Sequence, residues 1–496
     1  MAELVLNCNI LMEFVVEGNK MLNVNISYRQ YFISSIRYDI PNMLEIKWQG
    51  IYVYLGNGLD YDTVKDARDR KYLILGDVFT SSFPKTVEEE ISIYDGDDIN
   101  DLVNRWTGRW IIIGQDEIQI DACGLMQAFY YSSDTWFISS SLSLIKELSD
   151  MKFDYEVCDD GLNWRLLPYT LIRDVKSLIC TQKIKFSKDC INVLFNPWIQ
   201  CYDHLSTEAK VNILTNELTN TFKSIYRYSR REIWIALTGG KDSRLVLASA
   251  KNAEVPFSTY NSYHSSISSA DIRVPIQLAR KYGFTHHRFK PGAWSSEKES
   301  EYLYFNGGNS KGADWRFFSN GQHDLIPSDA VVIRGGIFEA GQNFARTILT
   351  DRIDDMYDQY TNYYNAYFDE RQSESLKLWL DYIRQHPIPF IDFRDRLYIE
   401  QRVGGWVASI EQALTINKWH AIQIANNRLI VSVLLSANSL ERKELALSFD
   451  AIRSIDKTLM EFTVNKQTVF DKIKYYSRFL LSPSAIYKFI KRRVKK

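Results

Sequence analysis

Cysteine is scarce in this sequence, and the cysteines lack the spacings that metal or disulfide sites need. The chain has 496 residues, and none of its cysteines forms a CxxC pair. The six are Cys8, Cys123, Cys158, Cys180, Cys190 and Cys201. A zinc site built from cysteine pairs and a disulfide-stapled scaffold are therefore excluded.

Long apolar runs and a net charge of one sign are also missing. No apolar run reaches the ~18–20 residues that a membrane-spanning helix needs, and the first residues lack a signal-peptide pattern. The formal net charge is -1, so the surface as a whole does not present the basic field that attracts nucleic acid. We therefore expect a cytoplasmic protein that does not bind nucleic acid.

The C-terminal segment from Tyr475 to Lys496 is a local exception, because basic side chains alternate there with apolar ones such as Phe479 and Ile490. A solvated basic helix end is the simpler interpretation, since cations are favoured at a helix C-terminus. A weak contact with a membrane or a partner protein is the alternative. A homodimer is left open as well.

Proline is limited to 11 residues, while hydrophobic residues make up 45% and charged residues 24% of the chain. This is the composition of a folded globular protein. The length exceeds what one ordinary core accommodates, so we expect two domains and leave a third open.

The first part of the chain, up to about residue 200, is predicted to be rich in β-structure. Short apolar segments are separated there by Gly, Asn and Asp. They include Ile51–Leu55, Trp110–Ile113, Ile118–Ile120 and Trp136–Ile138. The polar residues Gln115–Glu117 predict a turn between two antiparallel strands, and Ser139–Leu148 predicts a short helix.

From Ser206 onward the pattern changes to alternating helices and strands. A helix is expected over Thr207–Tyr226 and a fully apolar strand over Ile233–Leu237, which is typical of a parallel sheet. Further elements are expected at Ser243–Lys251 (helix), Val255–Tyr260 (strand), Asp271–Tyr282 (helix) and His286–Phe289 (strand). This βαβαβ order predicts a doubly wound nucleotide-binding fold. Helices are expected to dominate from about Asp351.

The turn between the apolar strand and the next helix carries the chemistry. It reads Thr238-Gly239-Gly240-Lys241-Asp242-Ser243. Glycines let backbone N–H groups approach an anion, a helix N-terminus favours negative charge, and hydroxyls donate to phosphate oxygens. Asp242 would repel phosphate unless a metal lay between them, and Mg²⁺ suits that position. The turn therefore predicts a pyrophosphate site in which the N–H groups of Gly239 and Gly240 face the phosphates.

A glycine turn before a helix also occurs without any ligand, and this is the plain alternative. The spacing is neither GxxxxGK[ST] nor GxGxxG, so neither of those nucleotide motifs is present.

At Thr238–Ser243 the sequence resembles the SGGxDS loop of PP-loop ATP pyrophosphatases, and the whole chain resembles the asparagine synthetase family. Further similar segments are Leu167–Leu171, Ser269–Asp271 and Tyr282–His287. The resemblance implies a β-rich sandwich of the Ntn-hydrolase type over residues 1–200. It implies a doubly wound parallel sheet with a helical extension, the ATP-binding ligase domain, over residues 201–496.

The resemblance also implies a site for ATP and Mg²⁺. The residues expected to contact ATP are Leu237, Thr238, Gly239, Gly240, Asp242, Ser243, Tyr260 and Gly335. Asp242 and Glu339 are the expected metal ligands. Glu339 departs from the family, where an Asp is usual, and a plain turn after a core strand is the alternative for this second loop.

Two catalytic residues are expected on the same grounds. Lys466 is the candidate for covering the polyphosphate, with Lys457 as the alternative. Glu400 is a candidate general base, and a helix-surface ion pair with Arg402 or Arg396 is the other interpretation. The tyrosine that β-lactam-forming members carry in the second loop is absent, because Gly336 or Ile337 stands there.

The first domain is expected to lack the glutaminase activity of the family. That activity needs an N-terminal Cys whose own α-amino group acts as the base. Ala2 follows Met1 here, and Cys8 lies in an apolar run without a free amine. The arrangement resembles members without this Cys, such as β-lactam synthetase and lasso peptide cyclase.

The sequence thus predicts an ATP-dependent ligase that adenylates a carboxylate and joins it to an amine. The substrates could be a peptide, another natural-product precursor or a surface glycan. Two alternatives remain open: an RNA-modifying PP-loop enzyme, disfavoured because no Cys follows Cys201, and a non-catalytic nucleotide sensor or scaffold.

Overall fold

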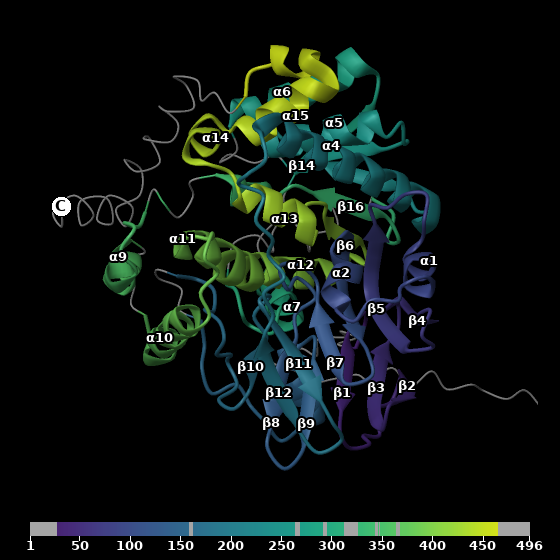
Figure 1. Ribbon diagram of the computed structural model, residues 1–496, viewed down its shortest axis with the longest axis vertical. Helices are drawn as coiled ribbons and strands as arrows, with labels where there is room; N and C mark the ends of the chain where they lie inside the picture. Colours follow the sequence, from purple (N-terminus) through teal and green to yellow (C-terminus); the bar gives the residue numbers. More distant parts are fainter. Residues whose placement is uncertain are drawn as a thin grey trace, which may run out of the picture.

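A computed structural model describes residues 27–157, 162–262, 268–290, 295–311, 326–342, 346, 348–363 and 368–464. Its first half is β-rich and its second half contains a parallel sheet with helices, so the expected fold class is confirmed (Figure 1). Cys8, Cys158, Lys466 and the basic segment 475–496 lie outside the described residues.

The first half consists of two six-stranded antiparallel sheets. The strands of sheet A, in spatial order, are β10 (Lys176–Ser177), β8 (Phe129–Ser132), β9 (Trp136–Ser139), β1 (Tyr31–Ser34), β3 (Ile51–Gly56) and β2 (Met43–Trp48). Those of sheet B are β12 (Ile191–Phe195), β11 (Gln182–Phe186), β7 (Glu117–Ile120), β6 (Trp106–Ile113), β5 (Lys71–Thr80) and β4 (Tyr61–Lys65). The expected hairpin is confirmed, with Ile113 opposite Ile118 across the turn.

The two sheets pack face to face. One buried cluster takes Ile33 and Val53 from sheet A and Leu75 and Ile111 from sheet B. Successive β6 residues alternate between this core and a second cluster, which contains Trp110 and is covered by α1 and α2. These helices are α1 (Val87–Ser92) and α2 (Ile99–Val103), and α3 (Leu142–Leu148) follows β9 with Ser141 as its N-cap. Strand β6 is therefore buried on both faces, and its side chains alternate between two apolar clusters.

The second half is built on a five-stranded parallel sheet. Its spatial order is β15 (Thr285–Phe289), β14 (Ser258–Ser262), β13 (Ile233–Ala236), β16 (Val331–Arg334) and β17 (His420–Gln423). The chain begins at the central β13, builds β14 and β15 on one side, and then adds β16 and β17 on the other. All these strands are parallel, but the side on which new strands are added changes between β13 and β16. In sheets of this kind, ligands bind at the carboxyl ends of the two strands that flank this change.

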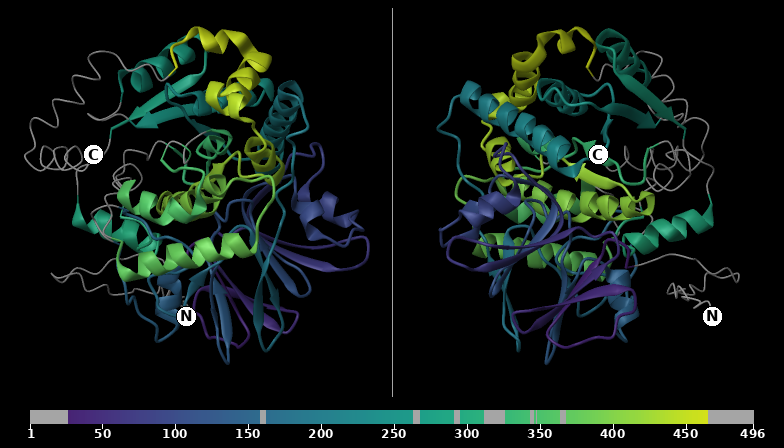
Figure 2. Two further views of the ribbon diagram at one scale, coloured as in Figure 1. Left: turned by 60° about the vertical axis from the view of Figure 1, so that its left-hand side comes forward. Right: turned by 90° about the vertical axis from the view of Figure 1, so that its right-hand side faces the viewer.

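Helices cover both faces of the parallel sheet. One buried cluster joins Ile235 and Ile333 to apolar residues of α4 (Thr207–Ser224), α5 (Lys241–Asn252), α6 (Ser269–Tyr282), α13 (Arg428–Leu435) and α15 (Ala446–Asp456). On the other face, Trp234 and Val332 pack with Leu414 of the 3-10 helix η6 (Leu414–Asn417). The views in Figure 2 show the helix-covered parallel sheet above the antiparallel sheets.

Several boundaries differ from those expected. The strand expected at Val255–Tyr260 begins at Ser258, because Pro256 has no N–H group for a strand ladder. Helix α4 ends at Ser224 and continues as the π-helical turn η1 (Ile225–Ser229). Strand β17 was not predicted, and it lies in the part of the chain where helices were expected to dominate.

The remaining elements form a mostly helical extension. They are α7 (Ser296–Phe305), η2 (Phe338–Gly341), η4 (Ile353–Asp355), α9 (Met356–Tyr363), α10 (Glu370–Gln385), α11 (Phe393–Arg396), the π-helical η5 (Leu397–Val407), α12 (Ala408–Ala413), α14 (Ser439–Glu444) and η7 (Lys457–Glu461). Among the described helices, none combines the length and the hydropathy required to cross a membrane.

Candidate functional site

Two loops meet where the strand order reverses: the first loop, residues 237–240 between β13 and α5, and the second loop, residues 335–342 after β16. A Cβ atom on Gly335 would lie 3.0 Å from Cγ2 of Val246 and 3.3 Å from the carbonyl oxygen of Asp242. The second loop therefore packs directly on the first turns of α5, and glycine permits this approach.

The first loop is shaped by its own hydroxyl groups. The Oγ atom of Ser243 lies 3.1 Å from Oγ1 of Thr238 and accepts from the Thr238 amide, also at 3.1 Å. The amide of Gly240 donates to Oγ1 of Thr238 over 3.1 Å. Both hydroxyls were expected to bind phosphate, and the structure shows that they also close the loop on itself. Leu237, fully buried, extends the sheet by donating its amide to the Tyr260 carbonyl.

The amide of Gly239 donates to Oδ1 of Asp271 over 2.8 Å. The other oxygen of this carboxylate accepts from Ser268 Oγ at 2.7 Å, and a Cβ on Gly239 would lie 3.0 Å from the Ala270 carbonyl. The start of α6 thus packs against the first loop at Gly239. In this structure the Gly239 and Gly240 amides, which were expected to face phosphate, donate to protein side chains.

The first turn of α5 offers a different set of donors. The N-cap of α5 is Gly240, which provides no side-chain acceptor for the amides that follow it. The amide groups of a first helical turn have no acceptor within the helix, and the helix dipole adds positive potential there. Helix α5 begins at Lys241, two residues earlier than expected, so the amides of its first turn are those of Lys241, Asp242 and Ser243. A helix start of this kind is suited to an anion.

The Asp242 carboxylate lies beside these amides with 24% of its side chain exposed. Its Oδ2 is 3.3 Å from Nζ of Lys241, and its Oδ1 accepts from Nε2 of Gln342 at 3.4 Å. Burial raises the pKa of Asp242, the nearby Lys241 ammonium lowers it, and the negative charge of Glu339 raises it. The two expected metal ligands are therefore close enough to repel each other, and carboxylate oxygens are the ligands that Mg²⁺ prefers.

Tyr398, on η5, adds a phenol to the second loop. Its hydroxyl donates to the Gly336 carbonyl over 2.8 Å. Burial, and then the charge of Glu339, raise the pKa of Tyr398 well above its usual value. The second loop itself lacks a tyrosine, and this one comes from a segment some sixty positions later. No local pattern in the sequence links the two segments, so Tyr398 was not predicted at this site.

A buried arginine on α14 holds the second loop in place. Arg442 donates to the carbonyls of Ala340 at 3.1 Å and Gln342 at 2.9 Å, and to the Asp395 carboxylate at 3.1 Å. Only 2% of Arg442 is exposed. The position of Glu339, one residue before Ala340, is thereby tied to the helical extension.

Tyr260 and Lys457 were also candidates from the sequence, one for ATP binding and the other as the alternative to Lys466. Tyr260 lies in a buried aromatic cluster with Phe289 and Trp419, and burial raises its pKa to about 12. Lys457 begins η7 and is exposed. Roles in nucleotide binding for Tyr260 and in catalysis for Lys466 stay predictions.

Glu400 is fully buried and its carboxylate has three donors. Oε1 accepts from Nε of Arg396 at 2.7 Å and from Oγ1 of Thr181 at 2.9 Å, and Oε2 accepts from Nε1 of Trp379 at 2.6 Å. The ion pair with Arg396 is one of the two interpretations that the sequence left open. The contacts support an ion pair with Arg396, but a buried one and not the helix-surface pair that was expected, because Glu400 is 0% and Arg396 2% exposed. The role of general base stays a prediction.

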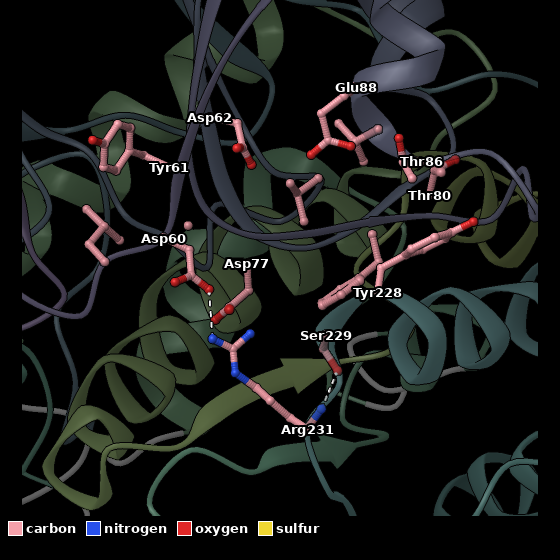
Figure 3. Close-up of a pocket in the computed structure, with 15 residues that line it drawn as sticks. Asp60, Tyr61, Asp62, Asp77, Thr80, Thr86, Glu88, Tyr228, Ser229 and Arg231 are labelled. Atoms are coloured by element: carbon pink, nitrogen blue, oxygen red, sulfur yellow. Dashed lines mark hydrogen bonds and ion pairs between the residues drawn. The ribbon is translucent and has the colours of Figure 1, made fainter.

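A second group of ionisable residues lies at the opposite, amino end of the parallel strands. Ligand atoms of Asp60, Asp77 and His420 all lie within 4.8 Å of one another, beside a cavity of about 570 Å³ whose lining includes both carboxylates (Figure 3). Arg231 already pairs with Asp60 at 3.3 Å, and Arg29 with Asp77 at 3.9 Å. This group therefore joins the two halves of the protein through paired charges.

The two halves also share a buried polar seam at the end of β17. Nδ2 of Asn426 donates to the Asp121 carboxylate at 2.8 Å, and its Oδ1 accepts from the Cys123 amide at 3.0 Å. Arg109 reaches Gln412 at 3.0 Å and Arg428 reaches Gln119 at 2.9 Å. The first half thus braces the sheet that carries the site.

A scan against protein-family models finds no match. A search of curated proteins also finds no match. Among solved structures, an NMN synthetase from Francisella tularensis has 12% identity over 40% of this chain and 94% of its own, with a TM-score of 0.21. A glutamine-dependent NAD+ synthetase from Acinetobacter baumannii, in complex with ADP, has 16% identity over 36% and 32%, with a TM-score of 0.20.

A third solved structure, of the allosteric regulatory enzyme of purine biosynthesis, has 8% identity over 53% of this chain and 75% of its own, with a TM-score of 0.23. Scores this low favour no particular function. The resemblance to the asparagine synthetase family therefore stays a prediction from the sequence.

Proposed function

We propose that the protein is an ATP-dependent ligase that adenylates a substrate carboxylate and then joins the acyl group to an amine. The observation that carries the proposal is the packing of the second loop, which contains Glu339, on the first turn of α5: Gly335 lies against the Asp242 backbone, and Gln342 donates to the Asp242 carboxylate at 3.4 Å. The N-cap of α5 has no capping side chain. An uncapped helix start next to two mutually repelling carboxylates suits a polyphosphate with Mg²⁺.

In the first step an oxygen of the substrate carboxylate attacks the α-phosphorus of ATP, the bond to the β-phosphate breaks, and pyrophosphate leaves. The amides of Lys241, Asp242 and Ser243 bind the departing phosphates, and the Lys241 ammonium offsets their charge. Asp242 and Glu339 would hold Mg²⁺, which supplies electrostatic stabilisation of the phosphate charge. Gly335 keeps the two loops in contact.

In the second step an amine attacks the acyl carbon, AMP leaves, and the nitrogen loses a proton. The amine comes from the substrate itself or from a second substrate. Tyr398 adds a phenol that donates to the Gly336 carbonyl of the second loop, and Glu400 serves as a structural residue in this proposal. The acyl and amine groups belong to a peptide, another natural-product precursor or a surface glycan.

Lys466 is retained as the residue that covers the polyphosphate. The carbonyl of Thr463 and the carbonyl of Gly239 accept from the same nitrogen of Arg244, at 3.0 Å and 3.1 Å. Thr463, three positions before Lys466, is therefore held close to the first loop.

The products of ATP cleavage test this proposal. The purified protein is incubated with Mg²⁺, ATP and fractions of a small-molecule and peptide extract from its source cells, and nucleotides are separated chromatographically. AMP and pyrophosphate in equal amounts, absent in Asp242→Asn, are expected. ADP and phosphate as the products would contradict adenylation.

A nucleotide-binding protein without catalysis is the second candidate. It is favoured by one observation, the engagement of the Gly239 amide by Asp271, which leaves this donor unavailable to phosphate. Saturable binding of ATP with no AMP from any fraction would support this candidate over the ligase.

A further inference from the structure

Arg244 links the first loop to a segment more than two hundred residues later in the chain. It lies in α5, is fully buried, and donates to four carbonyl oxygens. The acceptors are Gly239 at 3.1 Å, Leu459 at 3.1 Å, Phe462 at 2.8 Å and Thr463 at 3.0 Å. One side chain thus fixes residues 459–463 against the loop that we assign to pyrophosphate.

The charge of Arg244 has no anionic partner among the described residues. Its contacts there are all with neutral carbonyl groups, and its Nε atom has no hydrogen-bond partner in the described part of the chain. Burial lowers the pKa of Arg244 to about 10. A buried cation without a carboxylate is costly, and an anion bound nearby would offset that cost.

Residues 446–461 are docked on α5 and α6 by further contacts, in the region where Figure 1 shows α15 beside these helices. Lys251 pairs with Asp456 at 2.6 Å, Lys281 pairs with Glu461 at 2.7 Å, and the hydroxyls of Tyr282 and Thr458 lie 2.5 Å apart. None of these contacts involves the first loop. Arg244 also contacts residues 459–463, and it does reach the first loop, through the Gly239 carbonyl.

We propose that Arg244 is a positioning residue that couples nucleotide binding in the first loop to the docking of residues 459–463, with the polyphosphate compensating its buried charge. The inference rests on the proposed nucleotide site. Coupling between two sites is reciprocal, so a nucleotide must strengthen the docking as much as the docking strengthens nucleotide binding.

Hydrogen exchange of the wild-type protein tests the coupling without any substitution. Exchange is measured with and without Mg²⁺ and an ATP analogue blocked between the α- and β-phosphates. We expect at least threefold slower exchange both in residues 238–244 and in residues 457–463, with β6 of the sandwich unchanged. Slower exchange in the first loop alone would overturn the coupling and leave the nucleotide site intact. No binding and no change anywhere would overturn both.

Substitutions separate positioning from general stability. Arg244→Met removes the donors and the charge, and Arg244→Lys keeps the charge. Lys251→Met is the matched control, because it removes the ion pair with Asp456, which also docks this segment but does not touch the first loop. By calorimetry we expect at least tenfold weaker analogue binding for Arg244→Met, partial recovery for Arg244→Lys, and less than a twofold change for Lys251→Met. Equal losses in Arg244→Lys and Lys251→Met would overturn the proposal, and this comparison stands even if Arg244→Met does not fold.

Discussion

The amide of Gly239 and the carboxylate of Asp271 are joined by a 2.8 Å hydrogen bond between the first loop and the start of α6. An acid therefore lies at the edge of a site assigned to an anion. The same side chain has two opposite effects on a bound polyphosphate, because it orders the loop and repels the ligand.

These two effects can be separated by substitution. Asp271→Asn keeps an oxygen acceptor for Gly239 and removes the negative charge, so we expect binding of Mg²⁺ with an ATP analogue to tighten about two- to tenfold, ~0.4–1.4 kcal/mol. Asp271→Ala loses the acceptor as well, and binding should weaken. Calorimetric titration of both variants checks this, and weaker binding by Asp271→Asn would show that the charge itself is needed.

Gly335 is expected to be required for the contact between the two loops. In Gly335→Ala the added Cβ would meet Cγ2 of Val246 at 3.0 Å, so the second loop must move away from α5. Overpacking of this kind costs about 1–3 kcal/mol of stability. Analogue affinity should fall together with stability.

The double variant Gly335→Ala, Val246→Ala provides the control, because it removes the methyl group that the new Cβ meets. We expect the losses in affinity to be clearly less than additive, as holds for residues in direct contact. Additive losses, measured by calorimetry and urea unfolding, would show that Gly335 acts through something other than this contact.

Glu400 is expected to be needed for stability. Glu400→Gln removes the partner of the buried Arg396 guanidinium, 2.7 Å away, and leaving one member of a buried ion pair alone costs about 3–5 kcal/mol. We expect a lower urea midpoint and unchanged analogue affinity in the folded fraction. Normal stability together with loss of amide formation would instead support a catalytic base.

Asp62, which lines the cavity of Figure 3, is expected to make the free energy of unfolding depend on pH. Burial in the cavity wall, and then Glu88, raise the pKa of Asp62 to about 6. The folded state therefore binds this proton more tightly than the unfolded chain, and its stabilising effect is lost as pH rises through about 6.

Asp62→Asn should remove this pH dependence, because the amide supplies a permanent donor to Glu88. The side chain is partly exposed, so the gain at pH 7.5 is expected to be only about 0.5–1 kcal/mol after screening by solvent. At pH 4.5, where Asp62 of the folded protein is mostly protonated, the gain should be clearly smaller. Urea unfolding at both pH values measures the difference, and an equal gain at pH 4.5 would show that Asp62 does not titrate in this range.

Local sequence pattern was sufficient to predict the strand, loop and helix around residues 233–252. Strand β13 is apolar on both faces, and the glycines that follow it precede an amphipathic helix, so the order of strand, loop and helix could be predicted without a structure. The polar turn at Gln115 between two apolar runs similarly predicted the β6–β7 hairpin.

Contacts between distant segments could not be predicted in this way. Asp271 looks like an ordinary helix-start residue, and nothing in its neighbourhood indicates that it binds Gly239. Tyr398 and Arg442 reach the second loop across the tertiary fold. Strand β17 has four residues, all buried, of which only Ala421 and Ile422 are apolar. Neither an apolar run nor an alternating pattern therefore marks it as a strand.

The most direct test is calorimetric binding of Mg²⁺ with the blocked ATP analogue to the wild type and to Asp242→Asn. Because burial and Glu339 raise the pKa of Asp242, removing its charge should stabilise the free protein while abolishing a metal ligand. We therefore expect saturable binding by the wild type, and at least tenfold weaker binding, ~1.4 kcal/mol, by a variant whose urea midpoint is equal or higher. Equal affinity of the two proteins, or no binding by the folded wild type at millimolar analogue, would contradict the assignment of this loop to Mg²⁺ and ATP.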